Sequence, residues 1–92
     1  MSSHSYIKDK RNNHIYININ GDLIHRNEAK ISVFDSGFLL GDGVWEGIRL
    51  HKSSLVFIEE HLERLFESAK GIGLQIPLSK KEIIIEINKS LH

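Results

Sequence analysis

The chain has 92 residues, enough for one domain, and a domain of this size buries only about 60–65% of the surface that its unfolded chain exposes. Its core is therefore small, and we expect another protein surface to pack against it. Twelve Lys and Arg residues balance twelve Asp and Glu residues, which excludes the basic footprint of proteins that bind nucleic acids or membrane surfaces. Because the chain has no cysteine, a disulfide framework and a thiolate metal site are excluded, and a cytoplasmic location is expected.

The first residues of the chain are polar and mixed in charge. We expect residues 1–12 to form a flexible leader and residues 13–92 to form the domain. The leader lacks the apolar stretch of a secretory signal, and no apolar run approaches the roughly 18 residues of a membrane-spanning helix. The sequence therefore predicts a soluble protein without a membrane partner.

A β-hairpin is predicted directly after the leader. Isoleucines at positions 15, 17 and 19 alternate with polar or aromatic residues, which is the period of a half-buried strand. Asn20-Gly21 then provides a strong signal for a type I′ turn, because both residues tolerate a positive φ. Residues 23–25 are expected to return as the second strand.

A cluster of glycines around Asp35 and Asp42 predicts a loop with special backbone needs. Four glycines, at positions 37, 41, 43 and 47, fall within eleven residues. Such a cluster either lets a ligand approach the backbone or crowds a tight connection, and the spacing alone leaves both alternatives open. A second hairpin is predicted next, with residues 43–51 and 55–57 as its strands.

A helix is predicted over residues 59–70, where apolar residues recur at helical spacing. Gly71 and Gly73 are expected to end it. Ser79 and Glu82 have the spacing of a capping box, so a second helix is predicted to begin there. Its many β-branched residues leave a strand as the alternative. The predicted fold class is α+β, an antiparallel sheet of two hairpins with two helices on one face.

Two side chains are candidates for chemistry. Trp45 is either a pocket wall or a core anchor. Arg64 lies away from the apolar side of the first helix, where it is either a ligand contact or a solvated side chain paired with Glu60 or Glu67. The six histidines lack the spacing of a metal site, so no metal is predicted.

Two blocks of sequence carry a family resemblance. Residues 41–49 read GDGVWEGIR, and residues 60–65 read EHLERL, followed by Ser68-Ala69. In combination and spacing they closely resemble the class IV aminotransferases, which include branched-chain and D-amino-acid aminotransferases and aminodeoxychorismate lyase. The resemblance implies a homodimeric enzyme with pyridoxal 5'-phosphate as cofactor, of which this chain is the N-terminal small domain and the C-terminal cofactor domain is absent.

The resemblance also implies roles for four residues. Arg64 corresponds to the arginine that binds the cofactor phosphate, which suits a bidentate guanidinium. Trp45 and Gly47 correspond to positions at the substrate pocket, and Leu40 stands where some branched-chain members place a pocket tyrosine. Tryptophan replaces the phenylalanine or tyrosine common in the family, whereas the glycine favours the branched-chain members.

The resemblance leaves one essential group outside this chain. Transamination between an amino acid and a 2-oxo acid needs a lysine that holds the cofactor, and none of the eight lysines has a desolvated setting. No catalytic residue is therefore assigned, and the chain alone is expected to be inactive. The alternatives are a non-catalytic remnant that acts as an interaction or dimerisation module, and part of an aminodeoxychorismate lyase-like enzyme.

Overall fold

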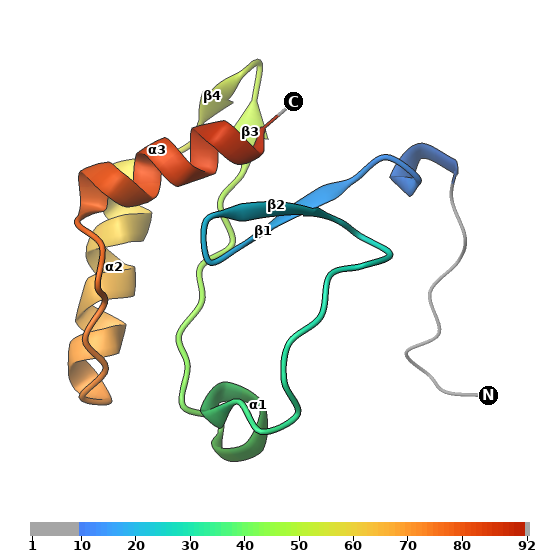
Figure 1. Cartoon of the computed structure of the whole chain (residues 1–92). Coiled ribbons are helices and arrows are strands. Elements are labelled where there is room, and N and C mark those ends of the chain that lie inside the picture. Colours follow the sequence, from blue (N-terminus) through green and yellow to red (C-terminus); the bar gives the residue numbers. More distant parts are fainter. Residues whose placement is uncertain (1–9, 92) are drawn as a thin grey trace. The chain divides into compact units, whose positions relative to one another are not determined.

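The computed structural model describes residues 10–91, and these fall into two compact units. One unit contains residues 10–30 and 84–91, and the other contains residues 31–83. The elements in chain order are η1 (Lys10–Asn12), β1 (Tyr16–Ile19), β2 (Asp22–His25), α1 (Ser36–Leu40), β3 (Leu50–His51), β4 (Ser54–Leu55), α2 (Ile58–Gly71) and α3 (Lys80–Ser90) (Figure 1). The predicted α+β class is confirmed.

The expected leader lies mostly outside the described residues, which begin at Lys10. The last three leader residues, Lys10–Asn12, form the short 3-10 helix η1. The Ile15 amide, one residue before β1, donates a hydrogen bond to the Asn12 carbonyl at the end of η1, at 3.4 Å.

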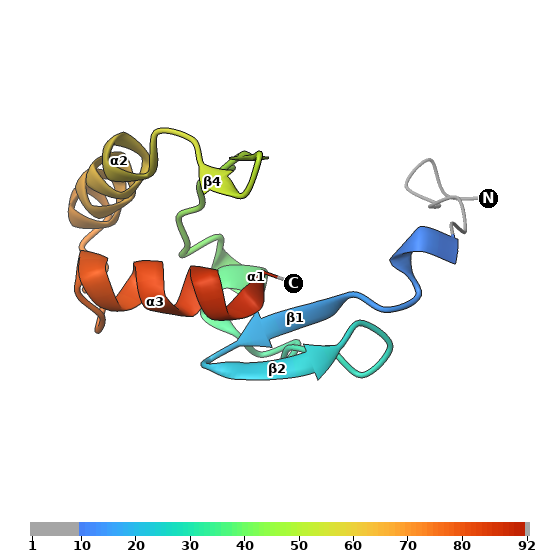
Figure 2. The ribbon, with the colours of Figure 1, turned by 90° about the horizontal axis from the view of Figure 1, so that it is seen from above.

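The first predicted hairpin is confirmed. β1 and β2 pair antiparallel, with Tyr16 opposite His25 and Ile19 opposite Asp22 (Figure 2). Asn20 and Gly21 occupy the turn with φ values of 54° and 92°, as a type I′ turn requires. The two-residue turn thus sets the register of the hairpin.

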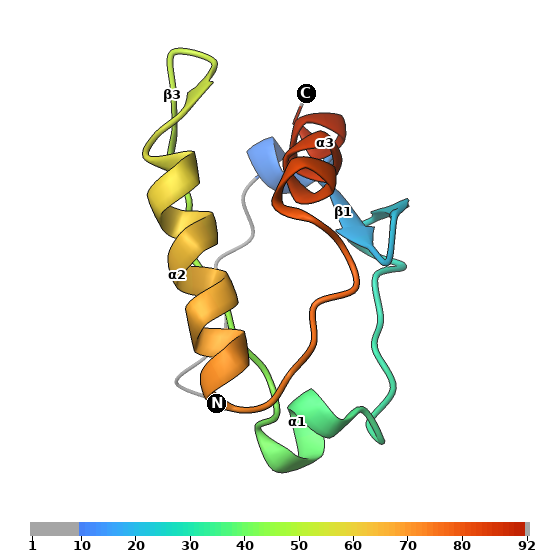
Figure 3. The same cartoon turned by 90° about the vertical axis from the view of Figure 1, so that its left-hand side faces the viewer.

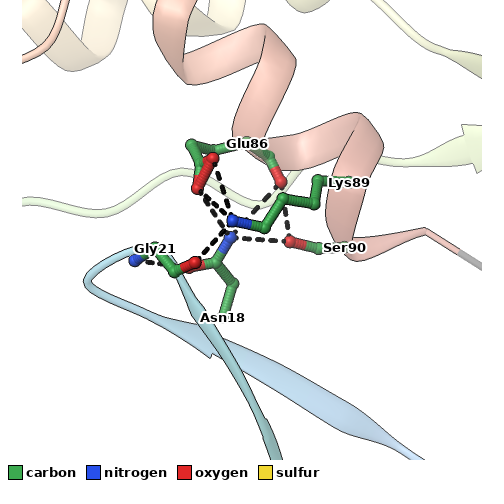
Figure 4. A network of polar contacts seen from close by, with 5 residues as sticks. All are labelled: Asn18, Gly21, Glu86, Lys89 and Ser90. Atoms are coloured by element: carbon green, nitrogen blue, oxygen red, sulfur yellow. Dashed lines mark hydrogen bonds and ion pairs between the residues drawn. The ribbon is translucent and has the colours of Figure 1, made fainter.

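Polar contacts join this turn to the last turns of α3 within the same unit (Figure 4). The Asn18 amide Nδ2 donates to Ser90 Oγ at 3.1 Å, to Glu86 Oε1 at 3.3 Å and to the Glu86 carbonyl at 3.4 Å. Lys89 Nζ donates to the Gly21 carbonyl and to the Glu86 carboxylate. Lys89, and secondarily Asn18, hold the pKa of Glu86 below its ordinary value.

The glycine-rich stretch contains the short helix α1, so the prediction of a loop around Asp35 and Asp42 was wrong for residues 36–40. Asp35 caps α1, because its Oδ1 accepts a hydrogen bond from the Gly37 amide at 2.8 Å. Gly41 ends α1 in the left-handed conformation, with φ 71°. The aspartate and that glycine are helix caps, and the short helical run between them gave no recognisable period.

The second predicted hairpin is confirmed in shorter form. β3 and β4 contribute two residues each, with Leu50 opposite Leu55 and His51 opposite Ser54. Lys52 and Ser53 form the turn with φ values of 48° and 64°. The hairpin leads directly into α2 (Figure 3).

The two hairpins form two separate two-stranded sheets, where one sheet of two hairpins was expected. The expected strand over residues 43–51 is formed only at Leu50 and His51, with one further backbone hydrogen bond from the Val56 amide to the Arg49 carbonyl at 2.9 Å. Glycines at positions 43 and 47 weaken extended pairing because they cost backbone entropy and provide no side chain to pack.

The first predicted helix is confirmed as α2. Among residues 10–91, the buried apolar side chains are Leu62 and Ala69 of this helix, exposed by 1% and 2%. Gly73 closes the helix with φ 72°, and the Leu74 amide returns to the Ala69 carbonyl at 2.8 Å. Gly71, the other expected end residue, still lies inside the last turn.

The second predicted helix is α3, which excludes the strand alternative. Its capping box is formed in both directions: the Glu82 amide donates to Ser79 Oγ at 3.1 Å, and the Ser79 amide donates to Glu82 Oε1 at 3.0 Å. None of the helices formed by residues 10–91 has the length and hydropathy needed to cross a bilayer.

Candidate functional site

The structure brings three charged or titratable side chains together within the unit of residues 31–83. Arg64 donates from Nε to Glu46 Oε2 at 2.9 Å and from Nη2 to Glu46 Oε1 at 2.7 Å. His61 Nδ1 lies 2.6 Å from the same Oε1 atom. Glu46 therefore links the segment before β3 to one face of α2.

Helix geometry places the two basic side chains for this contact. His61 and Arg64 are three positions apart on α2, so their side chains project from the same face of the helix. α2 begins at Ile58, directly after Phe57, whose backbone is left-handed with φ 54°. The β4 strand and this turn set the direction in which the first turn of α2 leaves the hairpin.

The charges of the cluster favour an ionised Glu46. Arg64, and secondarily His61, lower the pKa of Glu46 to about 2 from the ordinary value of 4.5. Glu46 in turn raises the pKa of Arg64. Because an ionised carboxylate only accepts hydrogen bonds, the short contact requires a proton on His61 Nδ1.

Arg64 is the residue predicted to bind the cofactor phosphate, and its side chain is 64% exposed. It pairs with Glu46, and no hydrogen bond within residues 10–91 joins it to Glu60 or Glu67, the partners that helical spacing suggested. Beside it lies a cavity of about 250 Å³ lined by Phe57, Glu60, His61 and Arg64. The prediction of a phosphate ligand at this position stays a prediction.

The outer edge of Arg64 is compatible with a phosphate group. Nε and one hydrogen of Nη2 are used by Glu46, whereas no residue in the range 10–91 accepts a hydrogen bond from Nη1. A guanidinium carries five N–H donors, so donors remain for phosphate oxygens. The donor set thus fits the phosphate, and the Glu60 carboxylate on the wall of the cavity is an unfavourable neighbour.

The other predicted site residues lie before β3. The Trp45 ring is 83% exposed, so the alternative of a core anchor does not hold for the described residues. A Cβ at Gly47 would lie 3.5 Å from Cζ3 of Trp45, an ordinary contact distance, so the ring is a close neighbour of Gly47. Leu40 is the last residue of α1 and is 72% exposed.

Sequence reasoning did not assign Glu46 and His61 to the site. The spacing of His61 and Arg64 on one helical face could have shown that they act together. No local signal could have shown their contact with Glu46, because 15 and 18 residues separate it from them. Among residues 10–91, no three His, Asp or Glu side chains gather in a way that could hold a metal ion.

Known proteins similar to this chain are aminotransferases by name. A protein of Methanocaldococcus jannaschii, provisionally named a branched-chain-amino-acid aminotransferase, is 44% identical over 76 residues, which are 83% of this chain and 26% of that protein. The branched-chain-amino-acid aminotransferase-like protein 1 of Arabidopsis thaliana and a D-alanine aminotransferase of Staphylococcus aureus are each 40% identical over 79% of this chain. No protein-family model matches the chain. The chain spans about a quarter of the bacterial and archaeal relatives and 13% of the plant relative.

Proposed function

We propose that this chain belongs to the class IV aminotransferases and is the N-terminal small domain of a transaminase that uses pyridoxal 5'-phosphate. The proposed reaction moves an amino group between an amino acid and a 2-oxo acid. The observation that carries the proposal is the 40–44% identity over about four fifths of the chain. The exposed, oriented guanidinium of Arg64 supports it.

Each proposed role follows from the chemistry of a side chain. Arg64 binds the cofactor phosphate through N–H donors that Glu46 leaves open. Trp45 provides an apolar wall for the substrate side chain, and Gly47 lets the backbone approach it. In a homodimer, Leu40 contributes to the substrate pocket of the neighbouring subunit. The bound cofactor supplies the electron sink for the carbon that gains or loses the amino group.

The proposal requires a second domain that carries the cofactor-binding lysine, and a homodimer in the cytoplasm. The exposed apolar side chains in the unit of residues 31–83 are consistent with a covering surface, since Phe34, Leu40 and Trp45 are exposed by 82%, 72% and 83%. A branched-chain L-amino acid is the favoured donor, because Gly47 follows Glu46 as in those family members. A D-amino acid is the second candidate, since D-alanine aminotransferases are also among the relatives.

The first experiment establishes the protein to which this chain belongs. The natural protein is incubated with pyridoxal 5'-phosphate, reduced with borohydride to fix the cofactor to its lysine, and measured as an intact mass. We expect a chain longer than 92 residues carrying one cofactor. A chain of this length without the adduct would contradict the proposal and support an interaction or dimerisation module.

A second experiment separates transaminase from lyase. The natural protein is assayed with branched-chain L-amino acids, with D-alanine and with aminodeoxychorismate, using a 2-oxo acid as acceptor where needed. We expect amino transfer from a branched-chain donor. Turnover of aminodeoxychorismate without transfer from any amino acid would support the lyase and contradict the transaminase.

A further inference from the structure

Glu46 connects the two parts of the proposed site. Its neighbours along the chain are Trp45 and Gly47, the proposed pocket residues. Its carboxylate is bound by Arg64, the proposed phosphate ligand, 18 positions away. The Glu46 side chain is only 11% exposed, so it is held against the protein while most of the Arg64 side chain reaches solvent.

The hydrogen bonds of Glu46 select one edge of the guanidinium. Arg64 uses its side edge, Nε and Nη2, with donor–acceptor distances of 2.9 and 2.7 Å. This is the bidentate geometry in which a guanidinium and a carboxylate match. Nη2 also lies 3.3 Å from His61 Nδ1, but the proton that Nδ1 needs for its contact with Glu46 makes both nitrogens donors, so this contact is no hydrogen bond. The end edge, formed by Nη1 and the second hydrogen of Nη2, remains for another anion.

The pairing also restricts the motion of Arg64. A long, mostly exposed side chain samples many rotamers unless a partner holds it. The two bonds to Glu46 and the contact of Glu46 with His61 limit that sampling before any ligand arrives. Fixing a group in its bound geometry increases affinity without adding a contact to the ligand.

We propose that Glu46 is a positioning residue, which holds Arg64 by its side edge so that the end edge binds the cofactor phosphate. Glu46 thereby ties the Trp45–Gly47 segment of the substrate pocket to the phosphate. This inference rests on the proposed function, in which Arg64 is the phosphate ligand. Glu46 itself touches neither cofactor nor substrate.

The direction in which one substitution changes phosphate affinity tests this inference. Glu46→Gln keeps the size of the side chain but removes the charge and one acceptor, so Arg64 loses its bidentate partner. If Glu46 positions Arg64, the variant binds phosphate more weakly. If Glu46 merely occupies the guanidinium in competition with the phosphate, the variant binds phosphate more tightly.

The measurement compares pyridoxal 5'-phosphate with pyridoxal, which lacks the phosphate. Dissociation constants of both are measured by absorbance titration on the full-length protein and on its Glu46→Gln, Arg64→Ala and Glu67→Gln variants. For Glu46→Gln we expect the preference for the phosphorylated form to fall roughly 5-fold or more, with pyridoxal affinity unchanged. Arg64→Ala should reduce the preference at least as far. Glu67→Gln, an equal charge change on α2, the helix that carries Arg64, should not reduce it.

The outcomes distinguish a failure of the phosphate role of Arg64 from a failure of the positioning role of Glu46. An unchanged preference in Arg64→Ala would remove the phosphate role of Arg64 and, with it, this part of the proposed function. A loss in Arg64→Ala together with an unchanged or increased preference in Glu46→Gln would overturn the positioning role alone. Equal loss of pyridoxal and pyridoxal 5'-phosphate binding in Glu46→Gln would also overturn it, since that is a general structural effect.

A second variant covers the case in which Glu46→Gln does not fold. Arg64→Lys keeps the positive charge but lacks the fork that takes Glu46 and phosphate at different edges. We expect Arg64→Lys to lose phosphate preference, and Glu46→Asp, whose shorter side chain draws the guanidinium away, to lose part of it. Full preference in both variants would overturn the positioning role.

Discussion

Three hydrogen-bond contacts converge on the Glu46 carboxylate, and its ionisation therefore depends on the folded structure. Two come from Arg64 and one from His61, and each favours the charged form of the carboxyl. In the unfolded chain these contacts are lost and the carboxyl titrates in its ordinary range. The pKa of Glu46 therefore depends on whether the contacts with His61 and Arg64 are intact.

The first prediction concerns acid stability. The pKa of Glu46 is lowered from 4.5 to about 2, so its contribution to stability is fully present above 4.5 and is lost as the pH falls from 4.5 towards 2. We expect Glu46→Gln to flatten the decline of stability in this window, measured as urea midpoints at several pH values. Glu67→Gln serves as control, and parallel curves for wild type and Glu46→Gln would contradict the prediction.

The second prediction concerns the exposed ring of Trp45. In the proposed pocket this ring limits the space for the substrate side chain, so Trp45→Phe in the full-length enzyme should shift preference toward bulkier apolar amino acids. The measurement is kcat/KM for a series from alanine to leucine and phenylalanine. Tyr16→Phe, a change at an exposed aromatic residue of the first hairpin, is the comparison. An identical substrate profile for Trp45→Phe would count against a pocket role.

The elements of this chain begin and end at residues whose side chains or backbone angles satisfy the terminal hydrogen bonds. Asp35 caps α1, Ser79 and Glu82 cap α3, and Gly73 closes α2. These caps act locally, because each capping residue lies within four residues of the helix end that it caps. They make short helices possible where the buried core contributes little.

The third prediction tests the capping box of α3. Ser79→Ala removes the acceptor for the Glu82 amide and should destabilise the start of the helix by about 1 kcal/mol. Hydrogen exchange at the Glu82 amide should accelerate accordingly, whereas exchange in α2 should not change. Ser68→Ala, on an exposed position of α2, is the matched control, because alanine there is at least as good a helix former. Unaltered exchange at Glu82 in Ser79→Ala would contradict the prediction.

The described residues leave much apolar surface uncovered. Among residues 10–91, two side chains are buried, Leu62 and Ala69, whereas the large apolar side chains of residues 31–45 are mostly exposed, including Phe34, Leu40 and Trp45. Surfaces of this kind mark sites where another protein surface packs. The small core agrees with the expectation from length, since short chains bury a smaller fraction of their surface.

The fourth prediction follows from that exposure. In the full-length protein we expect a covering surface to shield Trp45, so its fluorescence should be shifted to shorter wavelength and less quenched by iodide than in residues 1–92 alone. The Trp45→Phe variant of the full-length protein provides the background from other tryptophans. Equal quenching of Trp45 in both contexts would show that nothing covers this part of the chain.

Sequence by itself determined the features that depend on near neighbours. The Asn20-Gly21 turn, the span of α2, the αL residue Gly73 and the capping box at Ser79 follow from backbone preferences and from side chains within a few positions. The resemblance to aminotransferases could also be recognised from the sequence, because each of its two blocks is an unbroken run of residues. Periodicity failed at α1, since five residues are too few to show a helical repeat.

Only the tertiary structure decided the partners that lie far apart along the chain. Local spacing offered Glu60 and Glu67 to Arg64, yet the fold presents Glu46, which is held by a second contact to His61. The Asn18 turn likewise meets Glu86 across 68 positions. Such contacts depend on where turns and helices direct the chain, so no local pattern specifies them. The number of sheets was decided in the same way, because strand pairing beyond a hairpin is a long-range contact.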